Sequence, residues 1–317
     1  MPRPGRGPRS GALEERTFHR WLRSNLPAGR SGLLPLGDDA AALPVGRNRS
    51  VLLSSDALIE GVHFWRRSPP ILVGEAAAAV NLSDIAAKGG RPAALLIDVL
   101  VPEGTAESWA RSVLRGVERM GQRFGCHVVG GDTKPSRTRT VVGVSVGWGG
   151  RGRLARRGGA RVGDVVITTG VVGFGGANRG NITQSLRIQP RIREGLVLAP
   201  SVHSMTDTSD GIADAAHLVA EASGRRVVLE ESRLPFHPDL LRGRVSRSGR
   251  LARAFYGGDY ELFATAPSPR IPALRARLRR MKCPLTVIGR VERGSGAWLD
   301  RGGRLRPLPR AGWRHFG

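Results

Sequence analysis

Acidic residues are scarce in this chain, and several of them follow short apolar runs in segments rich in Gly and Ser. Asp and Glu total only 26 against 50 Lys and Arg. Because acids are this scarce, their repeated occurrence at such positions limits the folds and the kinds of chemistry that the chain can have. Apolar runs of this length predict buried strands, and carboxylates in the turns that follow are expected to meet in one cleft. The positions are Asp38 and Asp39 in LGDDAA, Asp56 in VLLSSDAL, Asp84 in NLSDIAAKGG, Asp132 in VVGGDTK, Asp207 and Asp210 in MTDTSDGIAD, and Asp259 in YGGDYELF.

Clustered carboxylates repel one another and shift each other's pKa values unless a cation lies between them. Mg²⁺ prefers a few carboxylates together with substrate phosphates and water, and Ser54, Ser55 and Ser209 would add neutral oxygens. Phosphoryl transfer at such a site depends mainly on positioning and on neutralising charge. The pattern therefore predicts a polycarboxylate site for Mg²⁺, and it names no substrate.

Each motif also has a purely structural explanation. GDD is a common turn, SSD and TDTSDG are typical helix caps, and NLSD suits a polar contact inside a helix. His63, alone in GVHF, is more often a packing residue than a functional one. The sequence has no Walker A motif and no protein-kinase motif set. If ATP is used, we expect metals, arginines and the glycine amides of 130–131 and 170–176 to hold its phosphates.

Alternating strands and helices predict an α/β (α+β) fold with two lobes. The Gly- and Arg-rich segment 149–164 has no hydrophobic period and marks a domain boundary. We expect a disordered basic tail over 1–12, an N-terminal domain over 13–150, a C-terminal domain over 151–317 and a mobile loop over 173–188. Expected strands are 51–53, 93–100, 127–130, 141–148, 165–169, 226–230, 261–266 and 285–291, and expected helices are 13–27, 72–88, 105–124, 206–223 and 272–281.

A net charge of +24 raises the question of nucleic acid. Lysine occurs only at Lys88, Lys134 and Lys282, arginine is spread along the whole chain, and aromatic residues make up only 5%. We therefore favour a compositional bias over nucleic-acid binding, although the field would attract anionic substrates. No apolar run approaches the ~20 residues of a membrane span, and the first residues lack the apolar region of a secretory signal. Two cysteines without metal spacing, Cys126 and Cys283, favour a reduced cytoplasm and leave a bridge between them open.

Taken in order, eleven segments resemble the thiamine-monophosphate kinase family of the aminoimidazole-ribonucleotide-synthetase-like ATP-binding superfamily. The resemblance runs from about residue 30 to residue 316 and implies that superfamily's two-lobed fold, with mixed sheets flanked by helices. It implies transfer of the γ-phosphoryl group of ATP to thiamine monophosphate, several Mg²⁺ ions between the substrates, and a homodimer paired through its N-terminal domains. The segments are LGDDAA, SSDALIEGVHF, AVNLSDIAAKGGRP, VVGGDTK, RRGGARVGD, ITTGVVG, QPRIREG, TDTSDGIADAAHL, GGDYELF, IGRV and AGWRHF.

Matched motifs also imply roles for individual residues. Gly131, Arg157 and Ser209 match positions that contact the nucleotide, and His63 and Trp313 match positions that contact the thiamine substrate. An aromatic face such as that of Trp313 suits a cationic heteroaromatic ring. No general base is assigned, because the acceptor is already a phosphate oxyanion. The implied metal ligands are Asp39, Ser54, Ser55, Asp56, Asp84, Asp132, Asp207 and Asp210.

The chain departs from the family pattern at three places. Gly258 stands where the family has a substrate-contacting Glu in GEDYEL, 174–176 lacks the Ser of GxSxxG, and Arg314 stands where an acid is usual. The alternatives are a paralogue with another phosphorylated acceptor, a basic nucleic-acid-binding protein, and a non-catalytic scaffold. A selenophosphate synthetase or a hydrogenase-maturation protein fits less well, because the reactive cysteine of each is missing.

Overall fold

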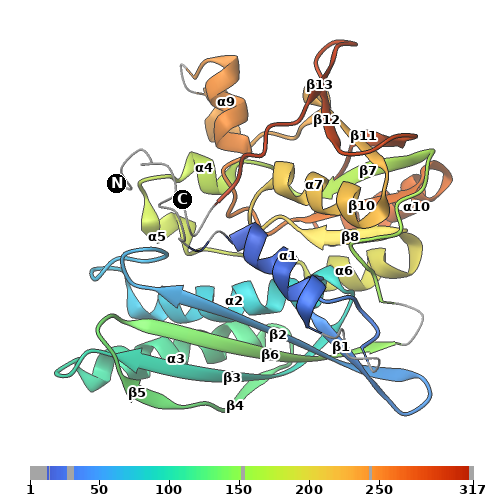
Figure 1. The fold of residues 1–317 in the computed structure, drawn as a ribbon. Helices are drawn as coiled ribbons and strands as arrows, with labels where there is room; N and C mark the ends of the chain where they lie inside the picture. The colour runs from blue at the N-terminus through green and yellow to red at the C-terminus, as the bar shows by residue number, and fades with distance from the viewer. Residues whose placement is uncertain (1–12, 14, 27–31, 151–153, 243–244, 314–317) are drawn as a thin grey trace.

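The computed structural model describes residues 13, 15–26, 32–150, 154–242 and 245–313. The expected basic tail, 1–12, and Arg314 lie outside the described residues. Two mixed sheets flanked by helices make up the fold, as the sequence predicts (Figure 1). The first sheet draws its strands from residues 41–150 and the second from residues 164–307.

The first sheet has six strands in the order β1-β2-β6-β3-β4, with β5 also paired to β3. Its pairs are antiparallel except that β4 and β5 run parallel to β3. Helices α2 and α3 pack against the strands on one face (Figure 1). The elements are β1 (Ala41–Val45), β2 (Arg49–Ile59), α2 (Pro70–Ala87), β3 (Arg91–Val101), α3 (Glu107–Gln122), β4 (His127–Gly130), β5 (Thr133–Pro135) and β6 (Thr140–Gly150), preceded by α1 (Glu15–Asn25).

The second sheet has seven strands in the order β13-β12-β9-β11-β7-β10-β8. All its pairs are antiparallel except β12 with β9. Its strands are β7 (Asp164–Thr169), β8 (Ser204–Asp207), β9 (Arg226–Glu230), β10 (Leu262–Pro267), β11 (Leu285–Glu292), β12 (Ala297–Asp300) and β13 (Leu305–Pro307). Its helices are α4 (Phe174–Ala177), α5 (Ile182–Ser185), α6 (Ile192–Leu198), α7 (Ile212–Ser223), α8 (Pro238–Arg242), α9 (Arg247–Ala254) and α10 (Ile271–Arg280), with short 3-10 turns η1 (Ala199–Ser201), η2 (Glu231–Arg233) and η3 (Ser268–Arg270).

Helix α2 lies between the first sheet and the second half of the chain, where it contacts α6 and β8 (Figure 1). Its run of alanines lets strands and helices approach from several sides, and 14 of its 18 residues are buried. The helix is long and apolar enough to cross a membrane by length and composition, but 78% of it is buried inside the fold. Leu82 and Ile85 of α2 belong to the same apolar cluster as Leu198 of α6, so the two halves share a core.

Four local expectations were wrong. The strand expected to end at Ser54-Ser55-Asp56 continues as β2 to Ile59, because pairing with β6 keeps an unbroken register there. Asp84 lies inside α2 rather than in a turn after a strand. The expected loop 173–188 contains α4 and α5. The expected helix over 206–223 begins only at α7, capped by Gly211 without a side-chain bond, because the preceding residues form β8 against β10.

Candidate functional site

Three aspartates from separate segments converge where the two halves meet. Asp39 lies in the turn before β1, Asp84 lies in α2, and Asp207 ends β8. One carboxylate oxygen of each lies within 4.8 Å of those of the other two. These three predicted metal ligands are therefore neighbours in space although they are far apart in the sequence.

A side chain of α2 positions Asp56 on β2 near this cluster. Asn81 Oδ1 accepts the backbone N–H of Asp56 at 3.0 Å, and Asn81 Nδ2 donates to the carbonyl of Ala77 at 2.9 Å. The contact requires glycine on the neighbouring strand β6, since a Cβ at Gly143 would lie 2.3 Å from Asn81 Nδ2. Asn81 was not among the predicted site residues, although it precedes Ser83 and Asp84 in the same NLSD segment.

Serine hydroxyls hold the carboxylates of Asp84 and Asp207. Ser54 Oγ donates to Asp84, Ser83 Oγ donates to Asp207 at 2.6 Å, and Ser209 Oγ donates to Asp207 at 3.0 Å. Because Ser83 belongs to α2 and Asp207 to β8, one of these bonds joins the two halves. Within the described residues, neither carboxylate has a Lys, Arg or His partner at ion-pair distance.

Two cations contact Asp39 instead. Lys88 Nζ lies 2.6 Å from Asp39 Oδ2, and Arg157 donates to Asp39 Oδ1 from Nε at 2.9 Å and from Nη2 at 2.6 Å. The Thr206 hydroxyl donates to the same oxygen at 2.6 Å. Burial opposes ionisation of Asp39, yet Arg157 and Lys88 hold its pKa well below the usual range.

The pKa values of the other three acids move in the opposite direction. Burial, followed by repulsion from neighbouring carboxylates, raises the pKa of Asp84 well above its ordinary value. Burial and the charge of Asp39 likewise raise the pKa of Asp207. The surrounding protein and the charge of Asp207 raise the pKa of Asp56 to about 6, although part of this residue is open to solvent. Among the described residues, none of these three acids has a Lys, Arg or His partner at ion-pair distance, so burial and the neighbouring carboxylates disfavour their ionised forms.

This donor set fits a hard divalent cation such as Mg²⁺. Carboxylate oxygens from Asp84 and Asp207 lie close together with serine hydroxyls beside them, and Mg²⁺ prefers oxygen ligands. A divalent ion bound here would stabilise the ionised forms of these acids, which burial and repulsion between carboxylates disfavour.

Two predicted ligands lie away from the cluster. Side chains alternate along β2, so Ser55 lies on the face of the sheet opposite to Ser54. Asp132 is 54% exposed in its side chain and contacts Lys134 at 3.3 Å. Asp56 on β2 pairs with Gly143 on β6, β6 pairs with β3, and β3 pairs with β4. The end of β4, next to Asp132, is therefore three strand spacings, or about 14 Å, from Asp56.

Gly131, a predicted nucleotide contact, lies at that β4 end. Its φ is +150°, and a Cβ there would lie 1.8 Å from the carbonyl oxygen of Ile97. The position therefore accepts only glycine, which leaves the backbone of the GGDT segment accessible next to the sheet.

The two predicted substrate contacts, His63 and Trp313, lie together although they stand near opposite ends of the sequence. Their ring centroids are 6.2 Å apart. Two residues that were not predicted lie beside them. The ring of Tyr256 meets that of Trp313 edge-on at 5.9 Å, and the guanidinium of Arg179 lies 5.2 Å from the Tyr256 centroid. We call His63, Tyr256 and Trp313, together with Arg179, the aromatic group.

Two acids of the GGDYELF segment, Asp259 and Glu261, anchor it to neighbouring parts of the chain. Asp259 accepts the backbone N–H groups of Gly173 at 2.8 Å and Gly175 at 3.2 Å, and Glu261 accepts from Arg191 Nε at 2.7 Å. Tyr260, between them, has a left-handed backbone with φ of 52°. Burial raises the pKa of Tyr260 well above its ordinary value, and so do the charges of Asp56, Asp207, Asp210 and Asp84. The tyrosine side chain therefore belongs to the surroundings of the carboxylate cluster.

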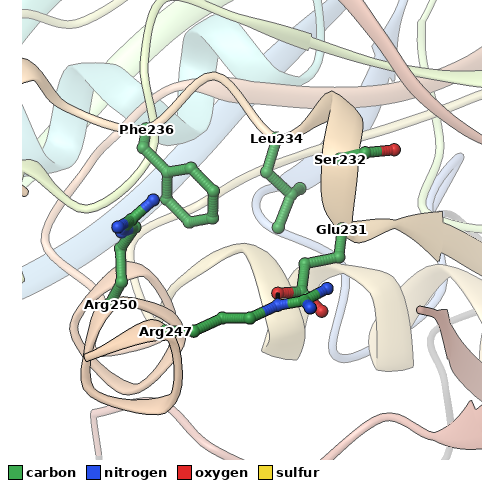
Figure 2. Close-up of a pocket in the computed structure, with 6 residues that line it drawn as sticks. All are labelled: Glu231, Ser232, Leu234, Phe236, Arg247 and Arg250. Atoms are coloured by element: carbon green, nitrogen blue, oxygen red, sulfur yellow. Dashed lines mark hydrogen bonds and ion pairs between the residues drawn. The ribbon is translucent and has the colours of Figure 1, made fainter. Parts of the chain in front are cut away.

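A separate cavity of about 380 Å³ lies beside η2 and α9 (Figure 2). Its one carboxylate, that of Glu231, is already bound by Arg247 and by Arg301 at 2.7 Å. None of the predicted site residues lines it. The lining residues are Glu231, Ser232, Leu234, Phe236, Arg247 and Arg250.

Comparison with known proteins covers nearly the whole chain. The N-terminal domain model of AIR synthase related proteins matches residues 37–150, and the C-terminal domain model matches residues 161–299. The thiamine-monophosphate kinase of Synechococcus elongatus is 34% identical over 76% of this chain and 82% of its own length. That of Pyrococcus horikoshii is 31% identical over 89% of this chain and 91% of its own. The solved complex of AaThiL with AMPPCP and TMP superposes with a TM-score of 0.84 at 30% identity, covering 96% of this chain and 97% of that one.

Proposed function

The chain belongs to the thiamine-monophosphate kinase family, and from this premise we propose that it transfers the γ-phosphoryl group of ATP to thiamine monophosphate, forming thiamine diphosphate. The observation that carries the proposal is the carboxylate cluster of Asp39, Asp84 and Asp207, which both halves of the chain build together. A phosphotransferase needs such a site because its transition state carries charge on the phosphoryl oxygens.

A relative solved with bound ligands supports the same substrates. The AaThiL complex holds AMPPCP, an analogue of ATP, together with TMP. We assign Gly131, Arg157 and Ser209 to the nucleotide. Arg157 carries a partly buried positive charge, and the Ser209 hydroxyl lies 3.0 Å from Asp207.

Magnesium, when bound, would neutralise phosphate oxygens of both substrates and align them for direct transfer. The protein's own residues hold the geometry: Asn81 fixes the backbone of Asp56, and Ser83 fixes the carboxylate of Asp207. Of the eight predicted ligands, Ser54, Asp56, Asp84, Asp207 and Asp210 belong to the proposed ion site, and Asp39 lies beside them in the same cluster. Ser55 and Asp132 lie away from this cluster and stay predictions. No side chain needs to remove a proton, because the attacking group is a phosphate oxyanion, so proximity carries the reaction.

The aromatic group is the proposed site for the thiamine rings. The rings of His63, Tyr256 and Trp313 lie at angles to one another, which suits a cationic heteroaromatic ligand. Gly258, in place of the family's Glu, has φ of +79°, and a Cβ added at this position would have its nearest neighbouring atom 3.4 Å away. There is room for a side chain at position 258, but the left-handed backbone disfavours one. We therefore assign recognition of the thiamine rings near Gly258 to Tyr256.

We further propose a homodimer that pairs through the first sheet and works in a reduced cytoplasm. The sheet face opposite α2 carries Val142, Val144, Val146 and Trp148 along β6, and Trp148 is 44% exposed. Both cysteines, Cys126 and Cys283, are free and buried, so neither needs an oxidising compartment. We keep the division into an N-terminal ATP- and Mg²⁺-binding domain, 13–150, and a C-terminal domain that completes the site, 151–317.

A turnover assay tests the proposed function. Purified protein is incubated with ATP, Mg²⁺ and thiamine monophosphate, and thiamine diphosphate is resolved by chromatography. Asp84→Asn should lower kcat by about 100-fold or more, because it removes one of the buried charges that the divalent ion needs. Asp239→Asn, at an exposed position of α8, is the matched control and should keep wild-type turnover.

Each outcome has a distinct meaning. Product that depends on Mg²⁺ and falls in Asp84→Asn supports the kinase and shows that Gly258 is tolerated. If no product forms with thiamine monophosphate but product forms with another phosphorylated acceptor, the proposed substrate is wrong and the proposed phosphoryl transfer stands. Equal turnover in Asp84→Asn and wild type would sink the assignment of the cluster.

A further inference from the structure

Lys88, directly after α2, is a buried cation inside the proposed magnesium site. Its side chain is fully buried, and so are those of Asp38 and Asp39. Nζ donates to Asp38, lies 2.6 Å from Asp39 Oδ2, and donates to the carbonyl of Met205 at 3.2 Å. Of the three donors of the ammonium group, one is given to Asp38 and one to the Met205 carbonyl, and Asp39 is paired with Lys88 through its charge.

The choice of lysine stands out against the rest of the chain. Only three of the 50 basic residues are lysines, and the other two, Lys134 and Lys282, are exposed. A lysine ammonium is a compact point charge, whereas the arginine guanidinium is a broad planar fork. In this structure the compact ammonium of Lys88 contacts the carboxylates of both Asp38 and Asp39.

Protein cations divide the acidic cluster into two parts. Asp39 contacts both Lys88 and Arg157, so its charge is balanced by the protein itself. Asp84 and Asp207 have serine hydroxyls as partners and, among the described residues, no cation at ion-pair distance. A divalent ion gains most where negative charge is unbalanced, which is the second part of the cluster.

We propose that the Lys88 ammonium is a resident cation that takes the place of a divalent ion beside Asp38 and Asp39. Divalent ions are then held by Asp56, Asp84 and Asp207, while Asp39 serves to seat Lys88 and Arg157. The bond from Lys88 to Met205 on β8 also ties the end of α2 to the second half of the chain. The inference rests on the proposed function, whose magnesium site it refines.

The experiment counts Mn²⁺ ions bound per chain by electron paramagnetic resonance, with full-length protein and no nucleotide or acceptor. Lys88→Met keeps the length of the side chain and removes its charge. We expect it to bind one more Mn²⁺ than wild type does. Lys282→Met, at an exposed position, is the matched control and should bind the wild-type number. A folded Lys88→Met protein with an unchanged or lower number would overturn the proposal.

A second pair of variants tests the same inference if Lys88→Met does not fold. Asp39→Asn should bind the wild-type number of Mn²⁺ ions, whereas Asp84→Asn should bind fewer. Loss of Mn²⁺ from both variants would show that Asp39 is an ordinary metal ligand and would refute the resident-cation role. Because no substrate is present, these counts stand whether or not the turnover assay yields thiamine diphosphate.

Discussion

Asp259 and Glu261, two acids of the GGDYELF segment, have different structural roles. Asp259 accepts two backbone N–H groups around the start of α4, and Glu261 binds Arg191 at the start of α6. With both neighbours anchored, Tyr260 is held in a left-handed conformation beside the carboxylate cluster. Asp259 therefore supports the site without belonging to it, and its buried carboxyl affects how stability depends on pH.

Burial raises the pKa of Asp259 to about 7, although the amide of Gly173 acts in the opposite direction. Between about pH 4 and pH 7 the folded chain keeps this proton while the unfolded chain loses it. The Asp259 contribution to the free energy of unfolding should therefore fall by up to about 1.4 kcal/mol per pH unit as pH rises, and level off above pH 7. Asp259→Asn should remove this part of the slope.

Urea unfolding at pH 5, 6, 7 and 8 measures the effect as a difference between wild type and Asp259→Asn. The Asp239→Asn variant, with its side chain at an exposed site, should follow wild type. Identical slopes in wild type and Asp259→Asn would contradict the assignment of a raised pKa.

Helix α2 is the element on which the whole arrangement depends. It packs on the first sheet, on α3, and on α6 and β8 of the second half. Its crossing with α3 is close because both helices have glycine there: a Cβ at Gly74 would lie 1.9 Å from the Val113 carbonyl, and one at Gly116 would lie 2.0 Å from the Ile71 carbonyl. The helix cannot move away from α3 without shifting Asn81 and Asp84.

Gly116→Ala should destabilise the fold by about 1–3 kcal/mol, because the new methyl group meets backbone atoms that cannot rotate away. The better helix propensity of alanine offsets only about 1 kcal/mol. Thermal unfolding of Gly116→Ala against Arg115→Ala, an exposed neighbour in α3, separates crowding from propensity. A Gly116→Ala protein as stable as wild type would show that the helices tolerate a wider spacing.

The sequence predicts elements well where local pattern and tertiary context agree. β4 and β9 match their expected bounds, and the carboxylates of Asp39, Asp84 and Asp207 meet as expected. β8 was missed because its four residues form a strand only through pairing with β10, which a local pattern does not contain. Lys88 and Tyr256 were missed for a similar reason, since their roles depend on partners that are distant in the sequence.

At the scale of the whole molecule, the two faces of the first sheet differ sharply. One is covered by α2 and α3, while the other exposes an apolar surface to solvent. Val144 lies near its middle, paired with Ser55 on β2 and Leu96 on β3. A surface of this kind is expected to be covered by another copy of the chain.

Val144→Arg should convert the proposed dimer to a monomer, because it would place a charge in the centre of an apolar interface. Analytical ultracentrifugation over a range of concentrations measures the change. Leu114→Arg, on the exposed side of α3, adds the same charge away from the interface and should leave the dimer intact. A wild-type chain that is monomeric at every concentration would contradict the proposed interface.

The location of the carboxylate cluster has a practical consequence for fragment complementation. If the chain is cut between residues 150 and 161, one fragment carries Asp39, Asp56 and Asp84, and the other carries Asp207 and Asp210. Neither fragment holds the full set of ligands, so catalysis in a mixture requires the two to reassociate. The rate of product formation would then report fragment association directly, and the chain would serve as a split reporter without an added dye.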